Sequence, residues 1–121
     1  MLLRNKDRET LLEIFSSVQL PMEVWAYGSR VSGKAHEGSD LDLVIRSSPL
    51  QKLPIEILMK LKEEIRESNI PIVVELFDWA RLPESFHHNI EANHEVLFSN
   101  LEMTMKEDAA EFKRRNDDTS G

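Results

Sequence analysis

The segment from Val24 to Ser48 reads VWAYGSRVSGKAHEGSDLDLVIRSS, and it decides the fold. An apolar run in it ends at Gly28-Ser29, and a second run carries Asp40 and Asp42 one residue apart. An isolated carboxylate in a half-buried strand costs free energy unless a cation or hydrogen bonds compensate it. The pair of aspartates therefore needs a physical reason.

The residues around these two features predict two strands joined by a turn. Residues 23–28 have the β-branched and aromatic content of a short strand that stops at Gly28. A helical turn is expected over residues 29–35, before glycines open a loop. Residues 40–46, DLDLVIR, alternate polar and apolar side chains until their apolar end, which predicts a second strand.

The rest of the chain continues to alternate helix and strand patterns. Apolar residues at helical spacing predict helices over residues 7–18 and 55–69, and residues 70–78, IPIVVELFD, predict a third strand. Pro83 marks the start of a last helix, whose apolar pattern continues to Phe98. This order predicts an α/β domain in which helices pack on a sheet of at least three strands.

Length and composition are those of one globular domain. The chain has 121 residues, of which 40% are hydrophobic and 31% charged, and residues 1–103 hold all the predicted elements. Residues 104–121 are charged and poor in large apolar side chains. They are expected to form a tail that is partly helical or disordered.

Charge and cysteine content exclude several functional classes. The formal net charge of -7 provides no strong positive field for extended nucleic-acid binding. The chain has no cysteine, so thiolate metal sites and cysteine nucleophiles are excluded. No apolar run approaches the roughly 20 residues of a membrane span, and the charged N-terminal segment lacks the core of a signal peptide. We therefore expect a cytoplasmic protein with no membrane partner.

The spacing of the aspartates indicates a metal site. Side chains two residues apart in a strand point to the same face, so Asp40 and Asp42 are expected to point together. Two carboxylates aimed at one point repel unless cations lie between them. Magnesium or manganese prefers oxygen ligands, and two such ions about 3.5–4 Å apart can clamp a phosphoryl group. The pair therefore favours phosphoryl or nucleotidyl transfer.

The Gly28-Ser29 turn supplies the second half of such a site. Backbone N–H groups at the start of a helical turn and the Ser29 hydroxyl can hold an anionic phosphate, while Gly28 permits close approach. Ser29 as a plain helix cap is the simpler alternative. Arg30 and Lys34 lie beside this turn and are weaker candidates for nucleotide contacts, because exposed basic residues usually only solvate a surface.

The segment GSRVSGKAHEGSDLDLVI resembles the signature of the DNA polymerase beta-like nucleotidyltransferase superfamily. The matching features are Gly28-Ser29, Gly33 and the Asp-Leu-Asp of residues 40–42. The small size and the later VVELFDWA are similar to the minimal nucleotidyltransferases, or MNT proteins. The resemblance covers residues 11–98. It implies the nucleotidyltransferase fold, with helices packed on a small mixed sheet.

The resemblance also implies a third carboxylate, on a later strand. Glu75 is the matching residue, where the family usually has aspartate. Glutamate keeps the charge but adds a methylene, which puts full activity in doubt. Asp78 is a rival three residues further on, but it would face the other side of a continued strand and is expected to cap or turn the chain. Asp40, Asp42 and Glu75 are thus the predicted catalytic and metal-binding residues.

Taken together, these features predict a metal-dependent nucleotidyltransferase. It would use two Mg²⁺ or Mn²⁺ ions to transfer a nucleoside monophosphate, AMP from ATP by resemblance, onto a hydroxyl. In the minimal family the acceptor is often a helical HEPN partner, and the nucleotidyltransferase is its antitoxin. So small a domain leaves little chain for an acceptor pocket, which also favours a second polypeptide, in a homodimer or a hetero-oligomer.

Two alternatives stay open. The protein could be a non-catalytic nucleotide-binding subunit or antitoxin that acts by contact, with Glu75 as the feature that favours this reading. It could instead modify a small hydroxylated molecule, although relatives of that kind usually carry an additional domain.

The remaining polar and aromatic residues are more simply structural. His36 has no partner residue in its loop, and His87, His88 and His94 lack the further ligands of a structural zinc site. The two tryptophans, Trp25 and Trp79, are expected in the core or an interface rather than as base-stacking platforms.

Overall fold

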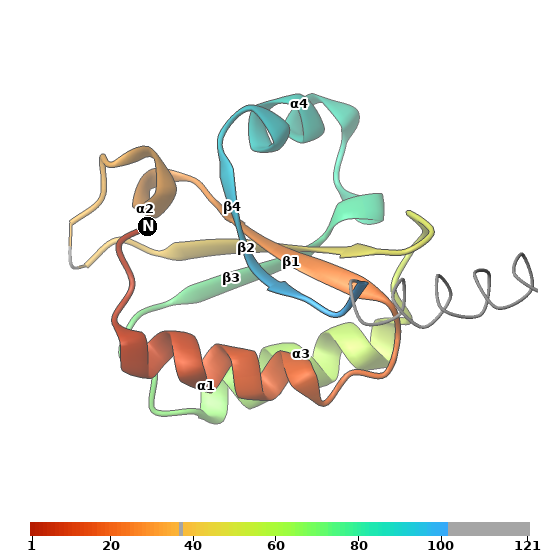
Figure 1. The fold of residues 1–121 in the computed structure, drawn as a ribbon, viewed down its shortest axis with the longest axis horizontal. Helices are drawn as coiled ribbons and strands as arrows, with labels where there is room; N and C mark the ends of the chain where they lie inside the picture. The colour runs from red at the N-terminus through yellow and green to blue at the C-terminus, as the bar shows by residue number, and fades with distance from the viewer. Residues whose placement is uncertain (37, 102–121) are drawn as a thin grey trace, which may run out of the picture.

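The computed structural model describes residues 1–36 and 38–101. Its elements alternate along the chain (Figure 1), and the following list gives their bounds. They are α1 (Asn5–Ser16), β1 (Met22–Tyr27), α2 (Ser29–Ser32), β2 (Leu41–Ser47), α3 (Ile55–Glu67), β3 (Val74–Asp78), the 3-10 turn η1 (Trp79–Arg81), α4 (Glu84–Ala92) and β4 (His94–Ser99).

The four strands form one mixed sheet in the order β3-β2-β1-β4. β1 is antiparallel to both β2 and β4, whereas β2 and β3 are parallel. The parallel pair is possible because α3 carries the chain back across the sheet between β2 and β3. The fold is therefore the small mixed sheet with packed helices that the sequence predicts.

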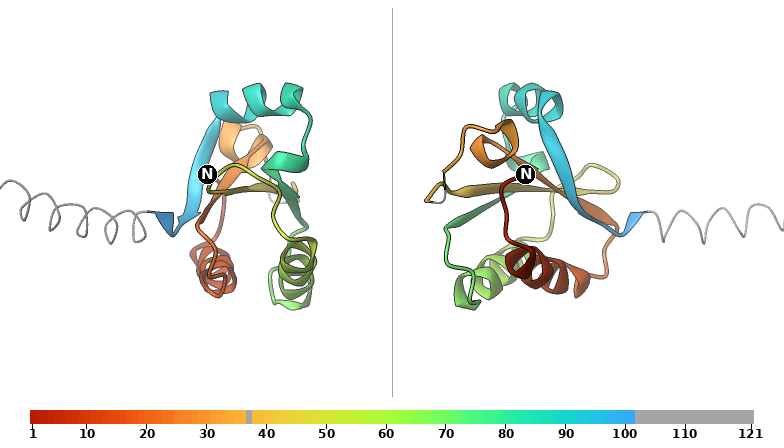
Figure 2. Two further views of the ribbon diagram at one scale, coloured as in Figure 1. Left: turned by 90° about the vertical axis from the view of Figure 1, so that its right-hand side faces the viewer. Right: turned by 60° about the vertical axis from the view of Figure 1, so that its left-hand side comes forward.

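The main core lies between one face of the sheet and the helices α1 and α3. Figure 2 shows these two helices side by side on that face, with α4 on the opposite side. Alternate residues of β2, including Leu41, Leu43 and Ile45, are fully buried against Leu11 and Phe15 of α1 and the apolar stripe of α3. Apolar burial on this face holds the fold together.

A smaller aromatic cluster lies on the opposite face, under α4. Trp25 and Val44 of the sheet pack with Trp79 of η1 and Ile90 of α4. Both tryptophans are buried, with 8% and 5% of their surface exposed, so they are core residues as predicted. The guanidinium of Arg46 lies 4.0 Å from the Trp25 ring and 4.5 Å from the Trp79 ring, where cation–π attraction stabilises it.

Two histidines complete this cluster, and each stacks on one of the tryptophans. His94 stacks on Trp25 with ring centroids 3.7 Å apart, and His87 stacks on Trp79 at 3.9 Å. Each ring also has a nitrogen near a backbone carbonyl, His87 Nε2 at 2.7 Å from Trp79 O and His94 Nδ1 at 3.1 Å from Ile90 O. These contacts give both side chains a packing role.

Most predicted elements are confirmed, with shifted ends. The first helix spans Asn5–Ser16 instead of residues 7–18, and the third strand begins at Val74 instead of residue 70. The prediction of a helix continuing to residue 98 is wrong: α4 ends at Ala92, and His94–Ser99 form β4. The strand forms because its backbone pairs with β1, a partner distant in sequence. The predicted tail, residues 104–121, lies outside the described residues.

No helix in the two described ranges is both long enough and apolar enough to cross a membrane.

Candidate active site

The candidate site begins with a row of three polar side chains across the sheet. In the strand registers, Tyr27 of β1 lies opposite Asp42 of β2, and Asp42 lies opposite Glu75 of β3. All three belong to the face that does not contact α1 and α3, since their neighbours Ala26, Leu43 and Leu76 fill the main core. Strand alternation therefore brings two carboxylates and a phenol together.

The backbone of Gly28, directly before α2, lies against the Asp42 carboxylate. A Cβ atom added to Gly28 would lie under 3.0 Å from Asp42 Oδ2. Gly28 also has φ +80 and ψ -158, a combination that essentially only glycine adopts. Both the space and the backbone conformation thus require glycine here, whereas the expected approach of a phosphate to this turn stays a prediction.

Asp40 stands at the edge of this row. It precedes β2, which begins at Leu41, so the prediction that both aspartates lie within one strand is wrong by one residue. Asp40 is exposed and Asp42 is half-buried. The charge on Asp40 nevertheless helps to raise the pKa of Asp42, so the two carboxylates interact electrostatically.

Burial and neighbouring negative charges both raise the pKa values of Asp42 and Tyr27. Burial raises the pKa of the Asp42 carboxyl, and the negative charges of Asp40 and Glu75 raise it further. Burial also raises the pKa of the Tyr27 phenol to about 12, with Asp42 and Glu75 adding to the shift. Unneutralised negative charge is therefore concentrated at this point, as at a site built to receive a cation.

The donor set fits a magnesium or manganese ion bound together with a nucleotide. Within residues 1–36 and 38–101 no group of three or more His, Cys, Asp or Glu side chains is placed to hold a metal ion. Magnesium, however, is usually bound by one or two carboxylates, with substrate phosphates and water as the other ligands. Asp42 and its carboxylate neighbours supply such oxygens beside the Gly28 turn.

Ser29 starts α2 directly after Gly28. Its hydroxyl makes no hydrogen bond within the described part of the chain, while its carbonyl accepts one from the Lys34 N–H. The hydroxyl is therefore available to a phosphate. The Val31 and Ser32 N–H groups are not, because both donate to the Gly28 carbonyl, at 3.1 and 3.0 Å. Lys34 is exposed near the end of this turn.

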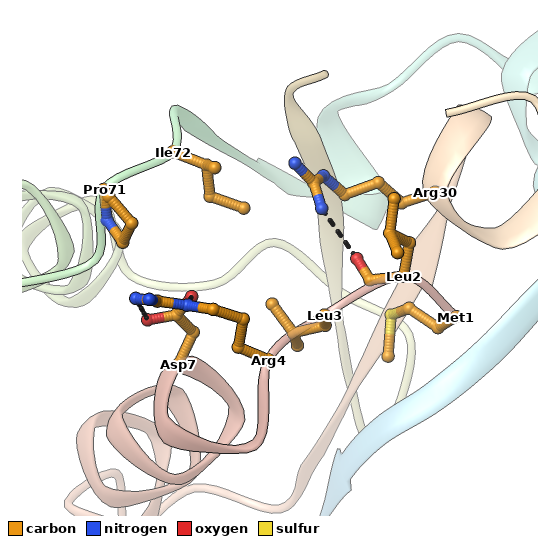
Figure 3. A pocket seen from close by; sticks show the side chains of 8 residues that line it. All are labelled: Met1, Leu2, Leu3, Arg4, Asp7, Arg30, Pro71 and Ile72. Carbon is orange, nitrogen blue, oxygen red and sulfur yellow. Dashed lines mark hydrogen bonds and ion pairs between the residues drawn. The ribbon is translucent and has the colours of Figure 1, made fainter. Parts of the chain in front are cut away.

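Arg30 has a structural position, contrary to its predicted place beside the phosphates. It is 5% exposed; its Nε donates to the Ser39 carbonyl at 2.8 Å, and its Nη1 donates to the Leu2 carbonyl at 2.7 Å. Figure 3 shows this guanidinium in a hollow of about 620 Å³ beside the N-terminal segment. The Arg4–Asp7 ion pair lines the same hollow. The hollow contains none of the three predicted carboxylates.

Asp78 is a structural carboxylate, as predicted. It is 2% exposed, and its Oδ2 accepts a hydrogen bond from the Leu53 N–H and pairs with Arg81 at 3.0 Å. Its other oxygen accepts from the Ala80 N–H at the start of η1. Because every one of these partners is part of the fold, Asp78 does not compete with Glu75 for the site.

Two parts of the site were not predicted from the sequence. Tyr27 was missed, although it directly precedes Gly28 and shares the strand parity of Trp25. A second hollow, of about 230 Å³, was missed as well: it lies against Tyr27, Gly28 and Ser32, and α4 supplies its other wall. The spacing of Phe86, Asn89 and Ile90, three and four residues apart, is the signal that could have placed these side chains on one helix face.

Comparisons with known proteins identify the family and the fold. Residues 9–103 match the family described as "Polymerase beta, Nucleotidyltransferase". The "Probable protein adenylyltransferase MntA" of Haemophilus influenzae is 45% identical over 76 residues, which are 61% of this chain and 63% of that protein. The chain thus matches less than two thirds of that relative's length.

Solved structures share the fold at low sequence identity. The crystal structure of a toxin-antitoxin with AMP-PNP matches with a TM-score of 0.63 and 15% identity, over 94% of this chain and 98% of that one. The structure of a tri-AMPylated Shewanella oneidensis HEPN toxin in complex with MNT antitoxin matches with a TM-score of 0.60 and 12% identity, over 98% and 100% of the two chains. The family match over most of the sequence, together with this shared fold, shows that the chain belongs to the polymerase beta nucleotidyltransferase family.

Proposed function

We propose that this protein is a metal-dependent protein adenylyltransferase, which transfers AMP from ATP to a hydroxyl of a partner protein. The observation that carries the proposal is the approach of the Gly28 backbone to the Asp42 carboxylate. It supports a phosphate site at the Gly28 turn beside a metal ligand at Asp42, and a nucleoside triphosphate bound with magnesium needs both.

Each residue of the site has a role in this proposal. Gly28 and Ser29 hold the β- and γ-phosphates through backbone N–H groups and the hydroxyl. Asp40 and Asp42 hold the two Mg²⁺ or Mn²⁺ ions, with phosphate oxygens and water as the remaining ligands. When bound, the ions neutralise phosphate charge and orient the α-phosphate for in-line attack. Lys34 stands near the triphosphate as a further candidate contact.

Glu75 receives the proton of the acceptor. The acceptor oxygen forms a bond to the α-phosphorus, while the bond from that phosphorus to the oxygen bridging to the β-phosphate breaks. Pyrophosphate leaves with the electron pair of the broken bond, and the hydroxyl proton passes to the Glu75 carboxylate. Catalysis then comes from positioning and charge neutralisation, with no covalent enzyme intermediate.

Similarity to known proteins supports a protein acceptor. The Haemophilus influenzae relative is named a probable protein adenylyltransferase, and one structural match holds an AMPylated HEPN toxin with its MNT antitoxin. We infer that a HEPN-type helical protein is the acceptor here and that this protein is its antitoxin. Glu75 is exposed, so a second polypeptide can reach it. We also infer a cytoplasmic location, because the proposed reaction consumes ATP.

Label transfer tests the proposal directly. The protein is incubated with Mg²⁺, a HEPN-type partner from the same host, and ATP labelled on either the α- or the γ-phosphate. We expect only the α-label to appear on the partner and none with Asp42→Ala, while the control Glu84→Ala, on the exposed start of α4, stays active. Transfer of the γ-label, or undiminished transfer with Asp42→Ala, would contradict it.

A contact antitoxin is the second candidate. It is favoured by the observation that the described carboxylates form no ready three-residue metal site. In that case Asp42→Ala would still neutralise the toxicity of the partner in cells, although no label is transferred. Loss of neutralisation together with loss of transfer would exclude this candidate.

A further inference from the structure

The hollow between α4 and the Gly28 turn is the feature that the proposed reaction does not use. Its volume is about 230 Å³, and its lining consists of Tyr27, Gly28, Ser32, Phe86, Asn89, Ile90 and Asn93. Typical pockets for drug-sized ligands have about 300–1,000 Å³. This hollow therefore suits a part of a nucleotide, with the phosphates outside it on the Gly28 turn.

One face of α4 lines the hollow. Phe86, Asn89 and Ile90 follow the three- and four-residue spacing that places side chains on one helix face, and Asn93 lines the hollow as the residue directly after α4. Ile90 is buried and anchors the helix on Trp25 and Trp79. The side chains of Phe86, Asn89 and Asn93 are exposed. The anchored helix presents Phe86 and Asn89 to the hollow, and Asn93 lines it directly after the helix ends.

The chemistry of this face suits a purine base. Phe86 has 49% of its surface exposed, so its ring is accessible to a ligand in the hollow. Aromatic rings in such positions stack on bases. The carboxamides of Asn89 and Asn93 make no hydrogen bond within the described residues. Each can therefore offer one donor group and one acceptor to a ligand.

The carboxamides of Asn89 and Asn93 favour adenine over guanine by their hydrogen-bonding pattern. An asparagine can pair with N6 and N7 of adenine through two hydrogen bonds, whereas guanine is most often bound by arginine or lysine. The hollow has no arginine, lysine, aspartate or glutamate in its lining. We propose that Phe86, Asn89 and Asn93 form an adenine-binding subsite that makes the protein selective for ATP. This inference rests on the proposed function, whose phosphate site adjoins the hollow at Gly28.

Equilibrium binding separates the base from the phosphates. Affinities for ATP, GTP and inorganic tripolyphosphate are measured by calorimetry with Mg²⁺. Phe86→Ala should weaken ATP binding about tenfold or more and leave tripolyphosphate binding unchanged, because base stacking is lost and the phosphate contacts remain. Asn89→Ala combined with Asn93→Ala should reduce the preference for ATP over GTP about tenfold.

Control variants and unfolding measurements distinguish a specific loss of binding from a loss of folding. His88→Ala changes an exposed residue of the same helix that does not line the hollow, and it should bind all three ligands as wild type does. Thermal unfolding of each variant identifies any that do not fold, and Phe86→Leu provides a second, apolar replacement without a ring.

Three outcomes would overturn the inference. The first is wild-type protein that binds ATP no more tightly than tripolyphosphate. The second is that the variants lose affinity for tripolyphosphate to the same extent as they lose affinity for ATP. The third is slower transfer with unchanged ATP binding, which would assign the hollow to the acceptor. Selective ATP binding without any AMP transfer would support the subsite and contradict the proposed function, so the two can fail separately.

Discussion

Asp42 lies directly opposite Glu75 in the parallel pairing of β2 and β3, and the charge of Glu75 helps to raise the pKa of Asp42. Two carboxylates at one register position repel each other in the absence of a cation. The folded protein therefore concentrates negative charge at the point where the proposed reaction brings metal ions and phosphates.

Removal of the Asp42 charge should stabilise the protein at neutral pH. The folded state raises the pKa of Asp42 above its ordinary value of 3.8, so it binds this proton more tightly than the unfolded state does. The contribution of Asp42 to the free energy of unfolding therefore falls as the pH rises from 3.8 through the higher pKa of the folded state. Asp42→Asn should have a higher melting temperature than wild type at pH 7, and the difference should shrink at pH 3.

Asp78→Asn is the matched control for this experiment. Asp78 is paired with Arg81 and bonded to backbone N–H groups, so its variant should lose about 1–3 kcal/mol of stability at pH 7. Equal destabilisation of both variants would show that Asp42 is a structural carboxylate.

Titration of Tyr27 measures the electrostatic state of the site. Tyr27 is the only tyrosine in the sequence, so the absorbance of tyrosinate reports this residue alone. Since burial, Asp42 and Glu75 raise its pKa to about 12, the midpoint should lie near 12 in the folded protein and near 10 in urea. Asp42→Asn with Glu75→Gln should lower the folded midpoint part of the way. A folded midpoint near 10 in wild type would refute the described environment.

Gly28→Ala should damage both stability and the site. The added Cβ meets Asp42 Oδ2, and alanine is strained at φ +80 with ψ -158, a cost of about 1–3 kcal/mol or more. Gly33→Ala is the comparison, because Gly33 has φ +86 but no atom within 4 Å of the added Cβ. It should lose about 1–2 kcal/mol in urea unfolding.

The affinity for Mn²⁺ with ATP then distinguishes the effects of the Gly28→Ala and Gly33→Ala substitutions. Gly28→Ala should weaken it, because Asp42 must move, whereas Gly33→Ala should leave it at the wild-type level. Equal binding by both variants would mean that the contact with Asp42 has no consequence for the site.

Glu75 tests the assignment of the proton acceptor. Glu75→Gln keeps the shape but removes the basic oxygen, so AMP transfer should fall about 10²–10⁴-fold. Glu75→Asp restores the carboxylate that the family usually has and should retain more activity than Glu75→Gln. The rate is measured as pyrophosphate release in the presence of the acceptor. Wild-type rates with Glu75→Gln would assign the proton transfer to another group.

Most of the fold could be predicted because each pattern was local. The alternation in residues 40–46 and the apolar stripe of residues 55–67 contain the information that sets β2 and α3. β4 could not be predicted in the same way, since the short apolar run of residues 96–98 fits a helix or a strand. Pairing with β1 decides between them, and that pairing joins residues far apart in the sequence.

The candidate site could be predicted in part for the same reason. Gly28 and Asp42 belong to one motif, and the structure brings them into contact. Tyr27 faces Asp42 only because of the β1–β2 register, and Asn89 reaches the Gly28 turn only because Ile90 anchors α4 on the two tryptophans. These relationships depend on tertiary packing: the spacing of residues on α4 can group them on one helix face, but it does not say which part of the fold that face meets.

The alternation of β2 also determines when the site forms. Leu41, Leu43 and Ile45 are fully buried on one face, and Asp42 lies between them on the other. A slip of one residue would move the carboxylate into the apolar layer and the leucines out of it. Correct burial of the leucines and correct aim of Asp42 are therefore one event, so the carboxylate is oriented as soon as the chain has folded, before any metal ion or nucleotide arrives.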